Sequence, residues 1–279
     1  MSTYYCLVAG LPDISLDDGK LSYSVSDFKA ELYSDLSAQD RKLIDLFYLK
    51  FDNTVILKLL KNKDAVIEDK GNFSAEELLQ LIEAVREGDT PDKKYPSYLV
   101  NFVSQYLQLS QDELYRADDL LAALYYSYGM SSNNAFIASW FEFNLNLNNI
   151  LAALAARKYK MEVSSVIVGA TSICEQLRTS NARDFGLNET LEYFEALQRI
   201  ADIEELVERE KKVDMLKWKW LEDESFSHYF TIERIFVFLM QLEMIERWIS
   251  LDKEKGNELF RKMIQDLKNE VQIPEEFRK

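Results

Sequence analysis

The near absence of glycine and proline most strongly constrains what this chain can fold into. Of its 279 residues, 8 are glycine and 4 are proline. Glycine and proline mark most turns and strand ends, so a chain of this length with so few of them is typical of long helices with few breaks. We therefore predict an all-α fold.

Residue types that carry out chemistry are also scarce. The chain has one histidine and two cysteines, although these types supply many of the nucleophiles, acid–base groups and metal ligands of proteins. We therefore expect a protein that is not an enzyme, that holds no cofactor or metal, and that works by binding. Cys6 and Cys174 lie far apart without a patterned spacing, which predicts two reduced thiols in the cytoplasm.

The net charge narrows the class of partner. The chain has 33 basic and 48 acidic residues, a formal net charge of -15. Such a charge repels nucleic acid and anionic lipid and suits a basic protein partner. No apolar run approaches the roughly 20 residues that span a bilayer, and residues 1–10 lack the basic region of a signal peptide. We expect a cytoplasmic protein that does not insert into a membrane.

Helix starts are marked by serines that precede a carboxylate by three residues. This spacing lets both side chains bond free backbone N–H groups in the first helical turn. The four pairs are Ser24 with Asp27, Ser37 with Asp40, Ser74 with Glu77, and Ser110 with Glu113.

Apolar periodicity and these start signals predict a series of helices. Residues 3–12 are aromatic and β-branched and are predicted to form a short strand or an extended arm packed on the body. The predicted helices span residues 40–62, 75–87 (ending at Gly88), 98–109, 111–128 (ending at Gly129), 133–159, 188–212, 231–250 and 254–271, the last two forming a hairpin near Gly256. Residues 163–169 are expected to be a connection or the start of the next helix.

The longest polar linker, residues 89–96, and the turn after residue 128 suggest two lobes. We predict an N-terminal helical lobe over residues 1–130 and a C-terminal one over residues 131–279, with one continuous unit as the alternative. Residues 52–63 and 146–157 also align without gaps, as DNTVILKLLKNK and NLNNILAALAAR. A shared helical period would produce much of this match and is the preferred interpretation, and an internal repeat is the alternative.

No motif identifies a catalytic site. A phosphate-binding glycine loop, a G-x-S-x-G elbow and an H-E-x-x-H pair are all missing from the sequence. His228, just before a predicted helix, is interpreted as a packed or capping residue rather than a general base. Carboxylates are plentiful, so a metal-dependent hydrolase built on helix-borne carboxylates stays an alternative, but exposed charged faces explain them more simply.

Aromatic residues cluster in three places: residues 125–128, 140–143 and 218–220. Each cluster covers more than one face of a helix, so some rings point away from the local core. Packing against another helix layer is the preferred interpretation, and a landing site for a partner is the alternative. Trp140 and Phe141 are the aromatic candidates for such an interface.

Two segments resemble helices of the C subunit of A-type and V-type ATPases (the d subunit in eukaryotic complexes). Residues 141–154, FEFNLNLNNILAAL, lead to Arg157, and residues 238–247, FLMQLEMIER, contain Glu243 and Arg247. Residues 4–13 and 181–187, YYCLVAGLPD and NARDFGL, are similar to an uncharacterised bacterial family whose genes accompany V-type ATP synthase operons.

The resemblance implies a fold and a function. The ATPase C subunit is a funnel of helical bundles that couples the central rotor stalk to the membrane ring of proteolipid subunits. A similar protein would be a non-catalytic ATPase subunit or accessory protein, cytoplasmic and peripheral at the membrane through the complex. Arg157, Glu243 and Arg247 are then interface candidates. Glu243 and Arg247 would tie bundles together, although an ordinary i, i+4 ion pair is the simpler expectation. A generic helical adaptor is the alternative function.

Overall fold

The computed structural model describes residues 4–68 and 70–270. These residues form α-helices and two 3-10 helices without a strand, which confirms the all-α prediction. The α-helices are α1 (Tyr5–Ala9), α2 (Val25–Leu32), α3 (Ala38–Lys61), α4 (Ala75–Glu87), α5 (Ser97–Tyr106), α6 (Ala117–Met130), α7 (Ala135–Lys158), α8 (Ser172–Thr179), α9 (Phe194–Ala201), α10 (Leu206–Glu224) and α11 (Ile232–Glu270). The 3-10 helices are η1 (Gln111–Arg116) and η2 (Val163–Val166).

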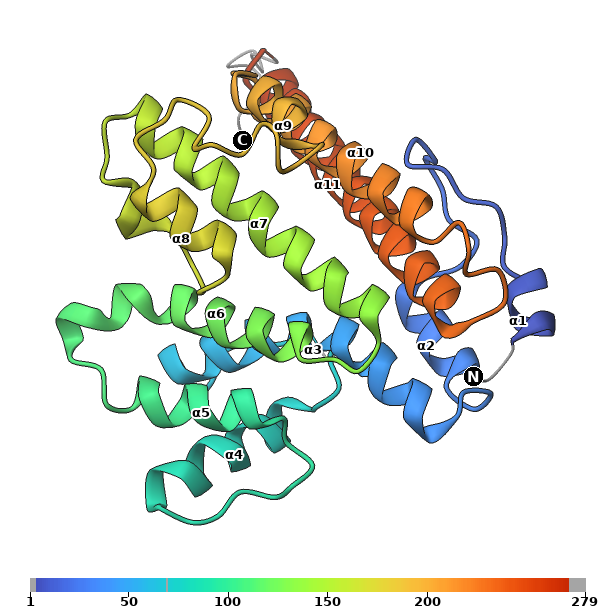
Figure 1. Cartoon of the computed structure of the whole chain (residues 1–279). Coiled ribbons are helices and arrows are strands. Elements are labelled where there is room, and N and C mark those ends of the chain that lie inside the picture. The colour runs from blue at the N-terminus through green and yellow to red at the C-terminus, as the bar shows by residue number, and fades with distance from the viewer. Residues whose placement is uncertain (1–3, 69, 271–279) are drawn as a thin grey trace, which may run out of the picture.

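The helices pack in chain order for much of the fold. α3, α4, α5, α6 and α7 each contact the next, and α7 also packs on α8 and α9 (Figure 1). α10 and α11 run side by side, and α11 returns to the first part of the chain by packing on α2 and α3. One hydrophobic cluster includes residues from α2 to α11. The cluster continues across residue 130, the predicted lobe boundary, because α6 packs on α7. The division into two lobes stays a prediction.

The serine start signals work as expected. Ser24, Ser37 and Ser74 each accept a hydrogen bond from the backbone N–H three residues later, at the starts of α2, α3 and α4. At the start of η1, which precedes α6, the backbone N–H and the hydroxyl of Ser110 both donate to the Glu113 carboxylate. Gly88 ends α4 in the left-handed conformation, with φ of 79°. The predicted ends of these helices follow from local chemistry that is visible in the sequence.

The prediction of a strand or extended arm at the N-terminus is wrong for residues 5–9. They form the short helix α1, while residues 1–3 lie outside the described residues. The segment does pack on the body, because the Tyr4 N–H donates to the Phe230 carbonyl at 2.8 Å and the Tyr5 and Phe230 rings lie 4.5 Å apart. A helical turn pairs backbone groups locally, whereas a lone strand would leave them unpaired.

The second half departs from the predicted helix boundaries in three places. The predicted helix over 188–212 is two helices, α9 and α10, because the Glu205 side chain accepts the N–H groups of Val207 and Glu208 and starts a new helix. The helix α8 lies outside the predicted helices. The predicted hairpin over 231–271 is one helix, α11, which runs through Gly256. One glycine costs a helix only about 1 kcal/mol relative to alanine, too little to end it without a cap or proline.

The two aligned segments, residues 52–63 and 146–157, each contain a polar residue that bonds to the backbone before a following helix. In α3, Asp52 accepts the backbone N–H groups of Asn72 and Phe73 at 3.0 Å, next to the Ser74 cap of α4. In α7, Asn149 accepts the Val168 N–H at 2.9 Å, in the segment that leads to the cap of α8. A polar residue in each long helix therefore positions the start of a following helix. The alignment pairs Asp52 with Asn146 and not with Asn149, so the internal repeat stays a prediction.

Gly129 lies inside α6 rather than after it. An ideal Cβ at this position would lie 2.1 Å from Cδ1 of Phe141 on α7. The Phe141 ring also packs against Tyr125 and Tyr126, so it has little room to move. The glycine is therefore explained by the close approach of α6 and α7 and not by a helix end.

Substituting Gly129→Ala is expected to destabilise the protein by about 1–3 kcal/mol, because overpacking the α6–α7 contact outweighs the gain in helix propensity. The free energy of unfolding in urea measures the effect. Gly19→Ala is the control, since a Cβ at Gly19 would meet nothing within 4 Å. Equal stability of the two variants would contradict the close-approach explanation.

The raised pKa of the Asp52 carboxyl predicts that the stability of the protein depends on pH. Burial raises its pKa to about 6, against the opposing effect of the hydrogen bonds from Asn72 and Phe73. An unfolded aspartate titrates near pH 4. The folded state therefore binds the proton more tightly, and this group's contribution to stability falls as pH rises from about 4 to 6.

Substituting Asp52→Asn removes this titration while keeping an oxygen acceptor. Raising the pH from 4 to 7 is expected to make the native protein less stable relative to the variant by about 2 kcal/mol. Urea unfolding of both proteins across that range gives the difference. If the free energy of unfolding changed equally with pH in the native protein and the variant, the pKa of Asp52 would not be raised in the folded state.

Candidate functional site

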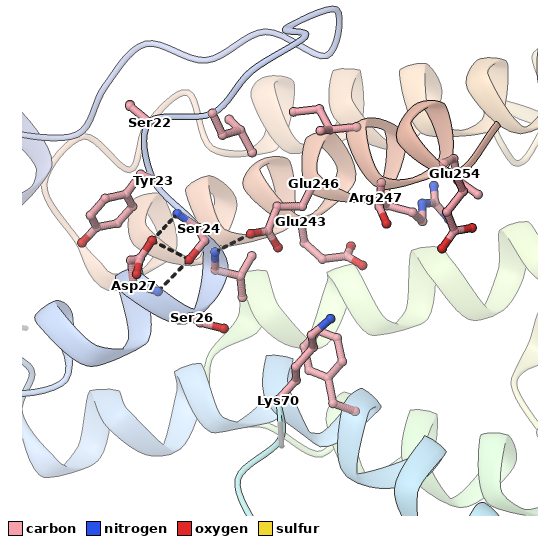
Figure 2. A pocket seen from close by; sticks show the side chains of 16 residues that line it. Ser22, Tyr23, Ser24, Ser26, Asp27, Lys70, Glu243, Glu246, Arg247 and Glu254 are labelled. Carbon is pink, nitrogen blue, oxygen red and sulfur yellow. Dashed lines mark hydrogen bonds between the residues drawn. The ribbon is translucent and has the colours of Figure 1, made fainter. Parts of the chain in front are cut away.

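Two adjoining cavities run along α11 and share Glu243 and Arg247 among their lining residues. The larger, of about 700 Å³, lies between α11, residues 21–27 at the start of α2, and Lys70 (Figure 2). The smaller, of about 300 Å³, is lined by residues of α3, α6, α7, α10 and α11. We name the two cavities together the α11 cleft. It brings together residues from the first and last parts of the chain.

Ion pairs connect α11 to two other helices at the point where the cavities meet. The Glu243 carboxylate lies 2.9 Å from the Lys50 ammonium on α3. The Arg247 guanidinium pairs with the Asp214 carboxylate on α10, which also accepts the indole N–H of Trp248 at 2.8 Å. Asp214 is 2% exposed, and these two donors satisfy its buried carboxylate.

Glu243 and Arg247 therefore do not form the ordinary i, i+4 pair expected from their spacing. Each pairs with a helix distant in sequence instead. The reason is geometric: the two side chains lie on the face of α11 between α3 and α10, so each reaches an oppositely charged neighbour across the interface. The tie between helical bundles that the resemblance to the ATPase C subunit implied stays a prediction.

The charges in the smaller cavity shift one another's pKa values. Desolvation lowers the pKa of Lys50, and the Glu243 carboxylate partly offsets this effect. Desolvation also lowers the pKa of Lys217, which makes no hydrogen bond or ion pair with any described residue. Burial acts to raise the pKa of Glu243, but the nearby Lys50, Arg247 and Lys217 charges outweigh it, so this pKa is lowered. Glu243 stays ionised, and the pair with Lys50 persists.

Aromatic residues also line the smaller cavity. Trp140 and Phe141 of α7 line it beside Tyr125 and Tyr126 of α6. Trp140 is 7% exposed and packs against Trp220, with ring centroids 5.5 Å apart, while Phe141 is 3% exposed. Both candidate aromatics therefore pack between helix layers, as preferred from the sequence, and both also line the cleft.

Acidic and hydroxyl side chains line the larger cavity. The Glu246 carboxylate accepts the backbone N–H of Val25 at 3.0 Å, which places a negative charge at the N-terminus of α2 (Figure 2). Ser24 and Asp27 form the capping box of the same helix. The charged residues that line this cavity are the carboxylates Asp27, Glu243, Glu246 and Glu254 and the cations Lys70 and Arg247. Its charge is negative and suits a basic ligand.

Arg157 lies outside the cleft. Its guanidinium donates to the Ser180 carbonyl at 2.8 Å and to the Arg183 carbonyl at 2.9 Å, and it lies 3.4 Å from the centroid of the Phe185 ring. These contacts hold residues 180–185 against the end of α7. Arg157 therefore fastens the NARDFGL segment, and its role as a partner contact stays a prediction.

His228 is a packed residue, as the sequence indicated. Its ring lies against Phe136, with centroids 5.5 Å apart, and its Nδ1 is 3.7 Å from the buried carboxylate of Glu233. Among the described residues, no group of three or more His, Cys, Asp or Glu side chains could hold a metal ion. None of the described helices combines the length and apolar character needed to cross a membrane.

Sequence reasoning missed the partners of Glu243 and Arg247. Lys50, Asp214 and Lys217 sit in α3 and α10 among many other charged residues, and no motif separates them. The one available signal is position: Asp214 lies beside the buried Val213, on the apolar side of a helix whose start is densely charged. A carboxylate on a buried face predicts a cationic partner, but not which one.

The coupling free energy between Lys50 and Glu243 is expected to be about 1 kcal/mol, because both side chains are mostly buried. A double-mutant cycle with Lys50→Met and Glu243→Gln, measured by urea unfolding, gives this value. The i, i+4 pair of Glu195 and Arg199 is the control, at 68% and 74% exposure, with an expected coupling of about 0.3–0.5 kcal/mol. A coupling no larger than the control would mean that the pair does not fasten α11 to α3.

Comparison with known proteins gives a family but no close relative of established role. A search of the curated proteins and a search of the solved structures each returned no match. The family model described as "Protein of unknown function (DUF2764)" matches residues 1–271, which is nearly the full length of the chain. The protein therefore belongs to the DUF2764 family.

Proposed function

We propose that the protein is a non-catalytic subunit or accessory protein of a V-type ATPase, similar to the C subunit, and that it binds a partner subunit in the α11 cleft. In this proposal it is cytoplasmic and reaches the membrane only through the complex. Its partners are the central-stalk and proteolipid-ring subunits. The observation that carries the proposal is the pairing of Glu243 and Arg247 with two different helices.

A protein that couples a rotor stalk to a membrane ring must transmit force without deforming. The Lys50–Glu243 and Asp214–Arg247 pairs connect α11 to α3 and to α10, and the hydrophobic cluster is continuous from α2 to α11. Close packing resists deformation and transmits strain. The sequence segment that carries Glu243 and Arg247 is also one of the two that resemble the ATPase C subunit.

The charge of the larger cavity supports a basic partner. Four carboxylates and two cations line it, within a chain of net charge -15. Complementary charge favours encounter with a basic segment and disfavours nucleic acid. A helical adaptor for an unrelated basic protein is the alternative function, because the same cleft would serve it.

Recovery of the tagged protein from its native host, in mild detergent, tests the proposal by mass spectrometry of the proteins that co-purify. We expect stalk and proteolipid subunits in stoichiometric amounts. Ser250→Trp is expected to reduce their recovery at least tenfold, because Ser250 is exposed and lines the larger cavity. Ser127→Trp, at an exposed position of α6 outside the cleft, is the control and should leave recovery unchanged.

The outcomes separate the two functions. Recovery of an unrelated protein, with the ATPase intact in the same extract, would favour the adaptor. Recovery of ATPase subunits by both variants alike would keep the ATPase association and exclude the cleft as the binding surface. Circular dichroism of both variants establishes that they are folded.

A further inference from the structure

Four exposed aromatic side chains gather where the turn between α10 and α11 meets the N-terminal helix. The turn lies beside α1 (Figure 1), and the Tyr4 N–H donates to the Phe230 carbonyl at 2.8 Å. The Tyr5 and Phe230 rings lie 4.5 Å apart, and the Phe226 and Tyr229 rings 6.1 Å apart. The two ring pairs adjoin, because Tyr229 and Phe230 are consecutive. We name Tyr5, Phe226, Tyr229 and Phe230 the turn patch.

The turn patch is large for exposed apolar surface. Phe226 is 76% exposed, Tyr229 60%, Tyr5 57% and Phe230 36%. With about 200 Å² for each aromatic residue, these fractions leave roughly 450 Å² exposed. Six aromatic residues are exposed in the part of the chain that the structure describes, and four of them belong to this patch. A patch of this size is comparable with the largest on a typical monomer, which often marks an interaction site.

Carboxylates border the turn patch. Glu222, Asp223 and Glu224 form the last turn of α10, just before Phe226, and all three are exposed. The Glu222 carboxylate accepts the indole N–H of Trp218 at 2.8 Å. The carboxylates of Asp223 and Glu224 have no hydrogen-bond or ion-pair partner among residues 4–68 and 70–270. Two acidic side chains next to the exposed rings are therefore available to a partner.

The end of α10 adds to this negative charge. The C-terminal end of a helix carries a partial negative charge, so cations are favoured there and carboxylates are not. The last turn of α10 has no basic residue. Within residues 219–234, the cations Lys219 and Arg234 face four carboxylates, and His228 lies beside the buried one, Glu233. The turn is negative, and a cation from a partner would be stabilised there.

Rings and carboxylates side by side suit one kind of partner side chain. The guanidinium of arginine pairs with a carboxylate through two parallel hydrogen bonds and packs flat on an aromatic ring. Cation–π contacts of this kind are worth about 0.5–1 kcal/mol at exposed sites. The exposed rings also give apolar surface that the aliphatic part of the same side chain covers.

We propose that the turn patch docks a basic, arginine-containing segment of a protein partner. Arginine side chains of that segment pack on the Phe226 and Tyr229 rings and pair with Asp223 and Glu224. The turn patch shares no residue with the lining of the α11 cleft, so it is a second surface. Its use does not depend on the proposed ATPase association.

Isothermal titration calorimetry with a peptide of six arginines, at physiological salt, tests the proposal. The protein is the full chain carrying Ser250→Trp, so that binding in the acidic α11 cleft does not contribute. We expect saturable binding that Phe226→Ser combined with Tyr229→Ser weakens at least tenfold. No saturable binding, or an unchanged affinity in this variant, would overturn the proposal.

A matched pair of rings outside the turn patch is the control. Tyr115 in η1 and Tyr159 at the end of α7 are 78% and 69% exposed. Tyr115→Ser combined with Tyr159→Ser should leave the affinity for the peptide unchanged. Equal weakening by the two pairs of substitutions would mean that exposed rings bind the peptide wherever they lie, which contradicts a defined site.

The carboxylates give a separate test. Asp223→Asn combined with Glu224→Gln should weaken binding of the peptide at least fivefold. Glu208→Gln combined with Glu210→Gln changes the net charge equally at exposed positions near the start of α10 and should leave binding unchanged. Equal weakening by both pairs would show that overall charge governs binding and would contradict the proposed site. All these side chains are exposed, so the melting temperature of each variant should match that of the parent chain.

Discussion

The attachment of α11 to α3 and α10 is the interaction on which the arrangement of this protein depends. α11 is the last described helix of the chain, and it packs on α2 and α3 near the beginning. Glu243 and Arg247, one turn apart on the same face of α11, pair with Lys50 of α3 and Asp214 of α10. Paired charges at a half-buried interface contribute little net stability but penalise every arrangement that separates them. The pairs therefore select one position of α11, and that position creates the cleft.

Much of the fold could be predicted from the sequence because its signals are local. The start of α4 at Ser74 and its end at Gly88 follow from capping chemistry within a few residues. The errors arise where the deciding contact is distant or subtle. Gly129 resembles a helix end in the sequence, yet it is explained by Phe141 on the next helix. Gly256 resembles a turn, yet one glycine is too weak a signal to interrupt α11.

The candidate site was predictable only in part, for the same reason. Four of the five candidates, Trp140, Phe141, Glu243 and Arg247, come together in the cleft. Arg157 lies outside it and donates hydrogen bonds to the backbone of residues 180–183. The cationic partner of Glu243 is about 190 positions earlier in the chain, and periodicity carries no information on such pairs. The charge pattern behaves similarly: a chain of net charge -15 has an acidic cavity beside α11 and a lysine-lined cavity beside α2. Composition alone does not separate the two.

The central claim is that a V-type ATPase subunit occupies the α11 cleft. Site-specific photo-cross-linking in the native host tests it most directly, with a photoreactive amino acid at Ser250 in the cleft and, separately, at Ser127 on α6. We predict a cross-link from position 250 to a stalk or proteolipid subunit and none from position 127. A cross-link to these subunits from position 127 but not from position 250 would contradict the claim and place the interface elsewhere on the protein.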